Sequence, residues 1–129
     1  IINEGIIKGS GALGGIVGCS KCMIENCVNN ATIIDVGVVN EGYSDGGIVG
    51  HIYGGPGVTK CTNNGNVTGI GEVGGIIGCC SSACSISECS NNGEIFSTLD
   101  SAVGGIIGKI LNVVRTEQLI CRNVRIMDI

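Results

Sequence analysis

The chain has 129 residues, of which 43% are hydrophobic and 2% aromatic, and its formal net charge is −4. The length allows one domain with one modest core. The acidic balance and the scarcity of aromatic residues argue against nucleic-acid binding, which needs basic surface and usually aromatic stacking platforms. No stretch reaches the ~18 consecutive apolar residues of a spanning helix, so we expect no membrane insertion.

The apolar residues are of the kind that builds strands. The sequence contains 21 Ile and 13 Val but only four Leu and one Phe. β-branched side chains fit a pleated surface, whereas the scarce Leu, Ala and Met are the residues that favour helices. The 24 Gly and the single Pro indicate many turns. We therefore expect an all-β fold of short strands.

Two short phrases recur along the chain. Gly-Gly-Ile-(Val/Ile)-Gly starts at residues 14, 46, 74 and 104. Cys-x-Asn-Asn starts at residues 27, 61 and 89, with a degraded copy at 121 and a truncated copy at the N-terminus. The second Asn of each copy lies at 3, 30, 64, 92 and 123, so the intervals are 27, 34, 28 and 31 residues. A period of this length with glycines at fixed offsets predicts a stacked repeat array.

We predict a β-solenoid of about four coils of ~30 residues. Residues 1–129 would form one repeat domain with units at about 3–29, 30–63, 64–91 and 92–122, and an atypical C-terminal coil at 109–129. The rival architecture, a propeller, typically needs ~40 or more residues per blade. Because the chain starts at Ile1 in mid-repeat, we expect a processed product or a piece of a longer protein.

Equivalent residues of successive coils should stack ~4.8 Å apart in columns. We place one Ile column inside, at Ile16, Ile48, Ile76 and Ile106. A second column should be an internal ladder of hydrogen-bonded amides at a turn, with Gly65 and Gly93 supplying a positive φ after it; its members are Asn30, Asn64, Asn92 and Asn123. The Gly-Gly pair should allow a tight corner and a close approach of the neighbouring coil.

The phrases resemble the GLUG motif family. Cys61-Thr-Asn-Asn-Gly-Asn-Val-Thr-Gly leading to Val73-Gly-Gly-Ile-Ile-Gly is the best match, and the resemblance covers nearly the whole chain. It departs from the motif in its nine cysteines and in Asn123-Val-Arg, which replaces Asn-Asn-Gly. The resemblance implies a passive repeat of secreted or cell-surface microbial proteins and brings no catalytic residue with it.

The cysteines fall into two sets. Four belong to the repeat and should face inward as small apolar residues, although disulfides along the column are an alternative: Cys27, Cys61, Cys89 and Cys121. The other five follow the glycine phrases and are candidates for local disulfides, chiefly Cys19 with Cys22 and Cys80 with Cys84; they are Cys19, Cys22, Cys79, Cys80 and Cys84.

Metal and catalytic sites are the sharper alternatives. Cys19, His51 and Cys79 directly follow the glycine phrase and would stack near Cys22, as zinc ligands can, but paired Cys-x-x-Cys spacing is missing. Asp35, Glu41 and Asp45 share a long loop and could bind Ca²⁺, but they lack an EF-hand pattern. His51 is the only histidine, so a Ser–His or Cys–His pair could form only there. We expect no cofactor, no resident metal and no catalytic residue.

Surface features complete the sequence-based expectations. Asn66 and Asn30 begin Asn-x-Thr sequons, and Asn66 is the better candidate for glycosylation because Asn30 belongs to the predicted internal ladder. Strand alternation predicts that the residues after the Ile column point outward, either under a neighbouring loop or as a contact stripe; they are Val17, Val49, Ile77 and Ile107.

These features together predict a non-catalytic structural or adhesive module, extracellular or on a cell surface. Its partners would be copies of itself stacked end to end, neighbouring repeats of a longer chain, or a glycan or other cell-surface ligand. One alternative is a subunit of an extracellular fibre, and another is a carbohydrate-binding or polysaccharide-cleaving β-helix.

Overall fold

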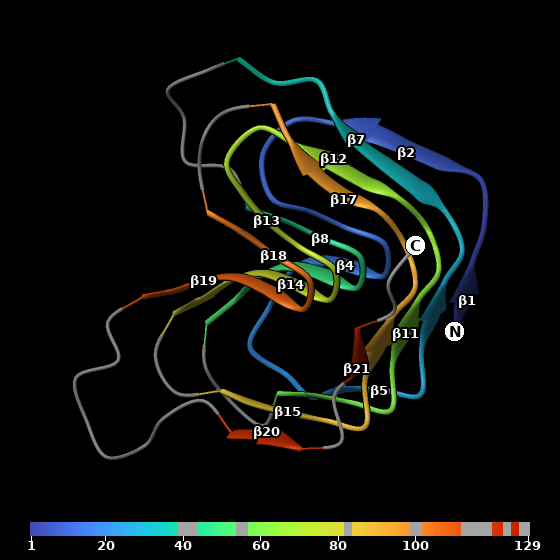
Figure 1. Cartoon of the computed structure of the whole chain (residues 1–129), viewed down its shortest axis with the longest axis vertical. Coiled ribbons are helices and arrows are strands. Elements are labelled where there is room, and N and C mark those ends of the chain that lie inside the picture. Colours follow the sequence, from blue (N-terminus) through green and yellow to red (C-terminus); the bar gives the residue numbers. More distant parts are fainter. Residues whose placement is uncertain are drawn as a thin grey trace.

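The structure is a computed structural model that describes residues 1–38, 44–53, 57–81, 84–98, 102–111, 120–122 and 125–126. These residues form 21 short strands, every strand pairing is parallel, and the described part of the chain contains no helix. Strands of successive coils lie side by side, five to a coil (Figure 1). The predicted β-solenoid is confirmed.

Five parallel sheets run along the solenoid (Figure 1). The first holds β1 (Ile2–Asn3), β6 (Val28–Asn29), β11 (Thr62–Asn63), β16 (Ser90–Asn91) and β21 (Arg125–Ile126). The second holds β2 (Ile6–Gly9), β7 (Thr32–Asp35), β12 (Val67–Gly69) and β17 (Ile95–Ser97). The third holds β3 (Leu13–Gly14), β8 (Ser44–Gly46), β13 (Glu72–Gly74) and β18 (Val103–Gly104). The fourth holds β4 (Val17–Ser20), β9 (Val49–Ile52), β14 (Ile77–Ser81) and β19 (Ile107–Leu111). The fifth holds β5 (Ile24–Glu25), β10 (Val58–Thr59), β15 (Ser85–Ser87) and β20 (Ile120–Arg122).

The coils differ in length. Val58 pairs with Ile24, 34 residues earlier, and with Ile86, 28 residues later. Strands β1–β15 make about three turns, and β16–β20 belong to a fourth. The extra length of the second coil falls between β7 and β8, where the sequence predicted a long loop; residues 39–43 of that loop lie outside the described residues.

Each glycine phrase forms an arch that folds into the interior of its coil. The chain runs inward along a strand of the third sheet, bends at the Gly-Ile pair and returns along the fourth sheet (Figure 1). At the bend, the N–H groups of Ile48 and Val49 both donate to the carbonyl of Ile76 in the next coil, at 3.1 and 3.0 Å.

The three glycines of the phrase are needed for two different reasons. The first and the last lie between the two arms, where a Cβ on Gly46 would collide with Val49 O and one on Gly50 would lie 2.6 Å from Ser44 O. The second lies at the tip, where a Cβ on Gly47 would collide with the Asn63 side chain and with the carbonyl of the next tip, Gly75. The predicted tight corner and close backbone approach are both present, and they explain why the phrase recurs in every coil.

A buried amide ladder lies opposite the tips. Asn29 Nδ2 donates to Asn63 Oδ1 and Asn63 Nδ2 donates to Asn91 Oδ1, both at 2.8 Å. Each side chain also bonds the backbone two residues later; for Asn63 these are the carbonyl of Gly65 at 2.8 Å and its N–H at 3.2 Å. The three amides are at most 1% exposed, and their donors and acceptors are paired within the coil stack.

The predicted Asn column is a second, outer ladder. Asn64 donates to Asn30 at 2.9 Å and Asn92 donates to Asn64 at 2.7 Å, but these side chains are exposed, so the prediction of an internal ladder is wrong. Asn3 pairs in register with Asn29 and so belongs to the buried ladder. Asn123 lies outside the described residues; the strand after it places Ile126 opposite Asn91.

The arch divides the interior into two lobes with separate cores. The core between the second and third sheets contains Ile33, Val67 and Val73, with Ile7, Leu13 and Ile95 partly buried against it. The larger core, between the fourth and fifth sheets, includes the predicted Ile column: Ile48, Ile76 and Ile106 are buried, and Ile16 packs against them at the end of the stack.

The expected outward stripe belongs to the larger core. Val49 and Ile77 are fully buried, and Val17 and Ile107 pack against the same cluster. The prediction failed because it assumed an unbroken strand, whereas the chain bends at the preceding Ile. Consecutive residues around the bend therefore face the same lobe, and alternation applies only within each arm.

The cysteine column is confirmed for three of its four members. Cys27, Cys61 and Cys89 are buried free thiols, each directly after a corner residue with positive φ: Asn26 (56°), Lys60 (53°) and Glu88 (52°). Cys121 does not belong to the column, because its strand places it opposite Ile86. The degraded fourth copy thus pairs in a different register from the one that the sequence repeat predicts, which would place Cys121 opposite Cys89.

The glycines after the Asn pair are required by space. Gly65 and Gly93 do not have the expected positive φ. A Cβ on Gly65 would collide with the carbonyl of Ala31, and one on Gly93 would collide with the carbonyl of Gly65. These residues therefore bring adjacent coils into close backbone contact and do not supply a left-handed turn.

The two ladders predict different costs for removing an amide. Asn63→Ala leaves buried donors and acceptors of Gly65, Asn29 and Asn91 unpaired, so we expect it to lower the free energy of unfolding by about 3 kcal/mol or more. Asn64→Ala, in the exposed ladder, should cost less than about 1 kcal/mol. Urea denaturation measures both; equal costs would contradict a structural role for the buried ladder.

The reassigned stripe gives a second prediction. Ile77→Lys places a charge in the larger core and should abolish the cooperative unfolding transition. Phe96→Lys is the matched control, since Phe96 is 61% exposed on β17, and this variant should remain folded. Circular dichroism and thermal melting compare the two; a folded Ile77→Lys chain would show that the stripe is a surface.

Candidate functional site

The polar residues around the arch form one candidate site, which we call the arch cluster: Ser44, His51, Glu72, Cys79, Ser81 and Lys109. Ser44 and Glu72 occupy equivalent places on β8 and β13, at the outer end of one arm. His51, Cys79 and Lys109 occupy equivalent places on β9, β14 and β19, on the other arm. Cys19 continues this column on β4, so the stacking of Cys19, His51 and Cys79 that the sequence predicted is confirmed.

The arms are joined by side-chain contacts through Glu72. Ser44 Oγ donates to Glu72 Oε2 at 3.1 Å, and Lys109 Nζ lies 3.5 Å from Glu72 Oε1. The lysine side chain is 43% exposed, so the ion pair is a weak contribution to stability. Glu72 therefore links the two arms across successive coils, and each of its carboxylate oxygens already has a partner.

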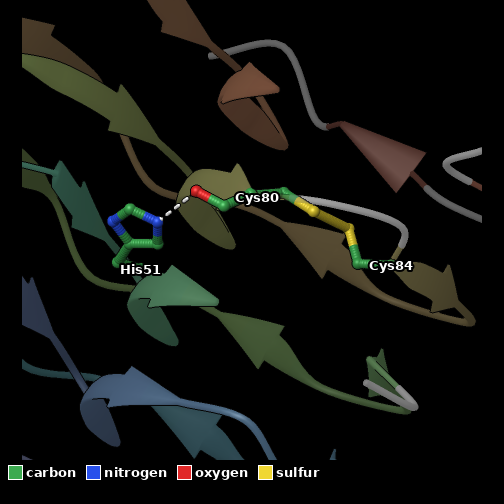
Figure 2. The surroundings of a disulfide bond; sticks show 4 residues. His51, Cys80 and Cys84 are labelled. Carbon is green, nitrogen blue, oxygen red and sulfur yellow. Dashed lines mark hydrogen bonds between the residues drawn. A yellow bond between two sulfur atoms is a disulfide. The ribbon is translucent and has the colours of Figure 1, made fainter. Parts of the chain in front are cut away.

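His51, the only histidine of the chain, pairs with Ser81. Its Nε2 and Ser81 Oγ are 2.6 Å apart, and its ring stacks on Tyr53 with 4.1 Å between ring centroids. Burial lowers the pKa of His51, and the charge of Glu72 opposes this in part, so the imidazole is neutral near pH 7. Figure 2 shows His51 on the strand next to the one that carries Cys80. The Cys80–Cys84 disulfide closes the short stretch of chain that contains Ser81.

This pair lacks the other parts of a hydrolytic site. Among the described residues, no carboxylate accepts a hydrogen bond from His51, so no group orients the ring as the third member of a triad does. Cys79 is 1% exposed, and burial, followed by the charge of Glu72, raises the pKa of its thiol. A buried protonated thiol is a poor nucleophile. The contacts of the arch cluster favour a role in closing the arch.

The predicted disulfide between Cys80 and Cys84 is present, and it links the end of β14 to the segment that leads into β15. Cys19 and Cys22 are exposed free thiols, so the pair predicted from Cys-x-x-Cys does not form. Cys79 is also free. Over the described ranges, no three His, Cys, Asp or Glu side chains are placed to hold a metal ion, and the stacked Cys19, His51 and Cys79 therefore form no zinc site.

A second polar cluster lies inside the smaller core. The sequence placed Asp35, Glu41 and Asp45 in one loop; Asp35 and Asp45 come together, and Glu41 lies outside the described residues. Asp45 is 0% exposed and Asp35 is 6% exposed. Burial, followed by the charge of Asp35, raises the pKa of Asp45 to about 8.

Sequence reasoning missed four members of the arch cluster: Ser44, Glu72, Ser81 and Lys109. A signal was present for three of them. Ser44 and Glu72 each stand two residues before the first glycine of the phrase, and Lys109 directly follows the phrase, like His51 and Cys79. Their repeat positions could have placed them on the two arms, but only the arch brings the arms together.

Both candidate glycosylation sites are accessible. Asn66 and Asn30 are exposed, so the reason for preferring Asn66, a buried Asn30, does not hold. Asn66 Oδ1 accepts a hydrogen bond from the Glu94 N–H at 2.9 Å, and Asn30 Oδ1 accepts one from Asn64.

Comparisons with protein-family models, with curated proteins and with solved structures find no match to this chain. Within the residues that the structure describes, none forms a helix long and apolar enough to cross a membrane.

The burial of the thiols predicts their reactivity. We expect iodoacetamide to label Cys19 and Cys22 in the native chain, because both are exposed, and to leave Cys27, Cys61, Cys79 and Cys89 unlabelled until the chain unfolds. Peptide mass spectrometry with and without urea locates the label. Cys80 and Cys84 should react only after reduction. Rapid native labelling of Cys79 would contradict the closed arch.

Proposed function

We propose that this chain is a non-catalytic structural repeat module that extends by stacking equivalent coils end to end, in an extracellular or cell-surface setting. The observation that supports this most directly is that the first coil presents the same columns of residues as the coils stacked on it. Strands β1 to β5 are the last members of their sheets, so one side of each backbone has no strand against it in the described structure. A strand edge of this kind is a template for another strand.

The side chains at this end fit an equivalent coil. The core columns continue to the end of the stack, where Ile7, Leu13, Ile16 and Val17 are only partly buried, in contrast to their fully buried counterparts in the second and third coils. Asn3 occupies the ladder position and donates to Asn29 at 3.3 Å and to Gly15 O at 2.7 Å. A further coil of the same type would bury these columns and lengthen the ladder.

The positions of the glycines, asparagines and cysteines support a structural, non-catalytic role. The glycines, the buried Asn ladder and the cysteine column all serve contacts between coils, and the arch cluster lacks an activated nucleophile. The Cys80–Cys84 disulfide and the resemblance to GLUG repeats support an oxidising, extracellular setting. Adhesion to a cell-surface ligand or glycan, and assembly into a fibre, are the uses that such a module would serve.

Blocking the open edge should stop stacking without unfolding the chain. The carbonyls of Gly5 and Gly9 accept hydrogen bonds from Thr32 and Val36 in the second coil, so the alternate residues Ile6 and Lys8 turn their N–H groups to the open side of β2. Lys8→Pro removes one such donor, which an edge strand tolerates. We expect the native chain to gain mass with concentration, and Lys8→Pro to remain at 13.0 kDa.

Sedimentation velocity over a concentration series measures this, and Lys8→Ala is the matched control that keeps the N–H group and should still associate. Thermal melting of each variant confirms that it is folded. A native chain that remains monomeric at every concentration would overturn stacking between copies, and association of Lys8→Pro equal to that of Lys8→Ala would show that another surface is responsible.

A further inference from the structure

The second coil departs from the repeat at two facing positions. In the first coil Gly9 faces Leu13, and a Cβ on Gly9 would lie 3.1 Å from Leu13 Cδ2. In the third coil Gly69 faces Val73 in the same way. Asp35 is the strand partner of Gly9, and Asp45 is the partner of both Leu13 and Val73. The first and third coils therefore have a glycine and an apolar residue here, and the fourth has Ser97 and Val103, whereas the second coil has two carboxylic acids.

The neighbouring coils act as an internal control. Since Leu13 and Val73 fill the smaller core on either side of Asp45, packing alone would favour another apolar residue at this place. The two replacements also coincide with an insertion. Four positions separate Gly9 from Leu13 and Gly69 from Val73, whereas ten separate Asp35 from Asp45. Three departures at one point of one coil indicate a local function that the other coils lack.

The oxygens of the pair are buried and mostly without partners. Asp35 Oδ1 accepts a hydrogen bond from the Gly37 N–H at 2.7 Å. In the described structure, Asp35 Oδ2 and both oxygens of Asp45 have no hydrogen-bond partner. Leaving buried polar atoms in this state is costly, and each instance in a native protein needs an explanation such as a bound ion.

We propose that Asp35 and Asp45 form a site for a divalent cation with a preference for oxygen ligands, Ca²⁺ being the fitting ion. A proton shared between the two carboxyl groups would occupy one oxygen of each, and the backbone N–H groups of Leu13 and Ile70, which lower the pKa of Asp45 in part, are the donors nearest to the rest of that carboxyl group. A divalent cation balances two carboxylate charges and can use all three oxygens. Hard cations such as Ca²⁺ take carboxylate oxygens together with backbone carbonyls and water.

The surroundings of the pair fit this ion. Asp35 ends β7, and the next residue, Val36, is 62% exposed, so the chain reaches the protein surface directly after Asp35. After burial, the charge of Asp35 is the largest cause of the raised pKa of Asp45, and the backbone N–H groups of Ile70 and Leu13 oppose it in part.

Proton competition gives the site a pH signature. Because Asp45 holds a proton up to about pH 8 in the absence of a cation, Ca²⁺ must displace that proton near neutral pH. Apparent affinity should therefore rise between pH 6 and pH 9, and binding at pH 7 should release about one proton per ion. A proton that is only shared predicts a different result, in which stability falls as pH rises from about 4 to about 8 and calcium has no effect.

The experiment is thermal unfolding and isothermal titration calorimetry of the full chain at pH 8 with CaCl₂, with MgCl₂ or with EDTA. We expect Ca²⁺ at about 100 times its dissociation constant to raise Tm by about 5 °C or more. The double variant Asp35→Gly/Asp45→Val restores the repeat and should fold without calcium, with at least a tenfold loss of affinity. Glu94→Gln, an exposed carboxylate elsewhere, is the matched control and should keep the response.

Two results would overturn the proposal. The first is a native chain with neither a calcium-dependent rise in Tm nor a binding heat, in which case a pH-dependent stability assigns the pair to a shared proton. The second is an unchanged calcium response in the Asp35→Gly/Asp45→Val variant. The proposal is independent of end-to-end stacking, because the readouts are taken on the monomer at low concentration.

Discussion

The contact between the glycine arches and the buried asparagine ladder is the constraint on which the rest of the structure depends. The tip of each arch, as at Gly47, reaches the amide of an opposite Asn, here Asn63, and leaves no room for a Cβ. This contact divides the coil into two lobes with separate cores. The ladder can lie in the interior because each amide is bonded along the stack and to its own backbone, so its burial carries little desolvation cost.

In a solenoid of this kind each coil must fit against its neighbours in the same way, and identical residues recur for that reason. Glycines, asparagines and small thiols occupy columns because a larger or unpaired group would disturb each of the adjacent coils. The departures from the repeat are therefore the informative positions. Asp35 and Asp45 stand where the neighbouring coils have glycine and apolar residues, and Ser44, Glu72 and Lys109 add polar contacts along and between the arms of the arches.

Features that depend on local sequence were predicted correctly, whereas features that depend on the bend of the chain or on the register between coils were not. The Ile column was predicted correctly, because periodic glycines and β-branched residues mark it directly. The outward stripe was wrong because the bend at Ile48 puts Val49 into the same lobe. Asn30 was placed inside, although Asn29 is the buried amide, because two adjacent Asn residues look alike in sequence and only the strand register distinguishes them. Cys121 was misaligned for the same reason: its strand pairs it with Ile86, whereas its letters match Cys89.

The sequence by itself determined the architecture: a β-solenoid of short strands, the inward Ile column, three of the four cysteines of the inward cysteine column, and the glycine phrases where backbones approach closely. These are local consequences of side-chain size and β-branching, repeated at a fixed period. The tertiary structure decided which of two adjacent asparagines is buried, how the arch splits the core, and which distant polar groups meet. Those outcomes depend on the direction in which a corner turns and on the register between coils, and neither is a property of a short stretch of sequence.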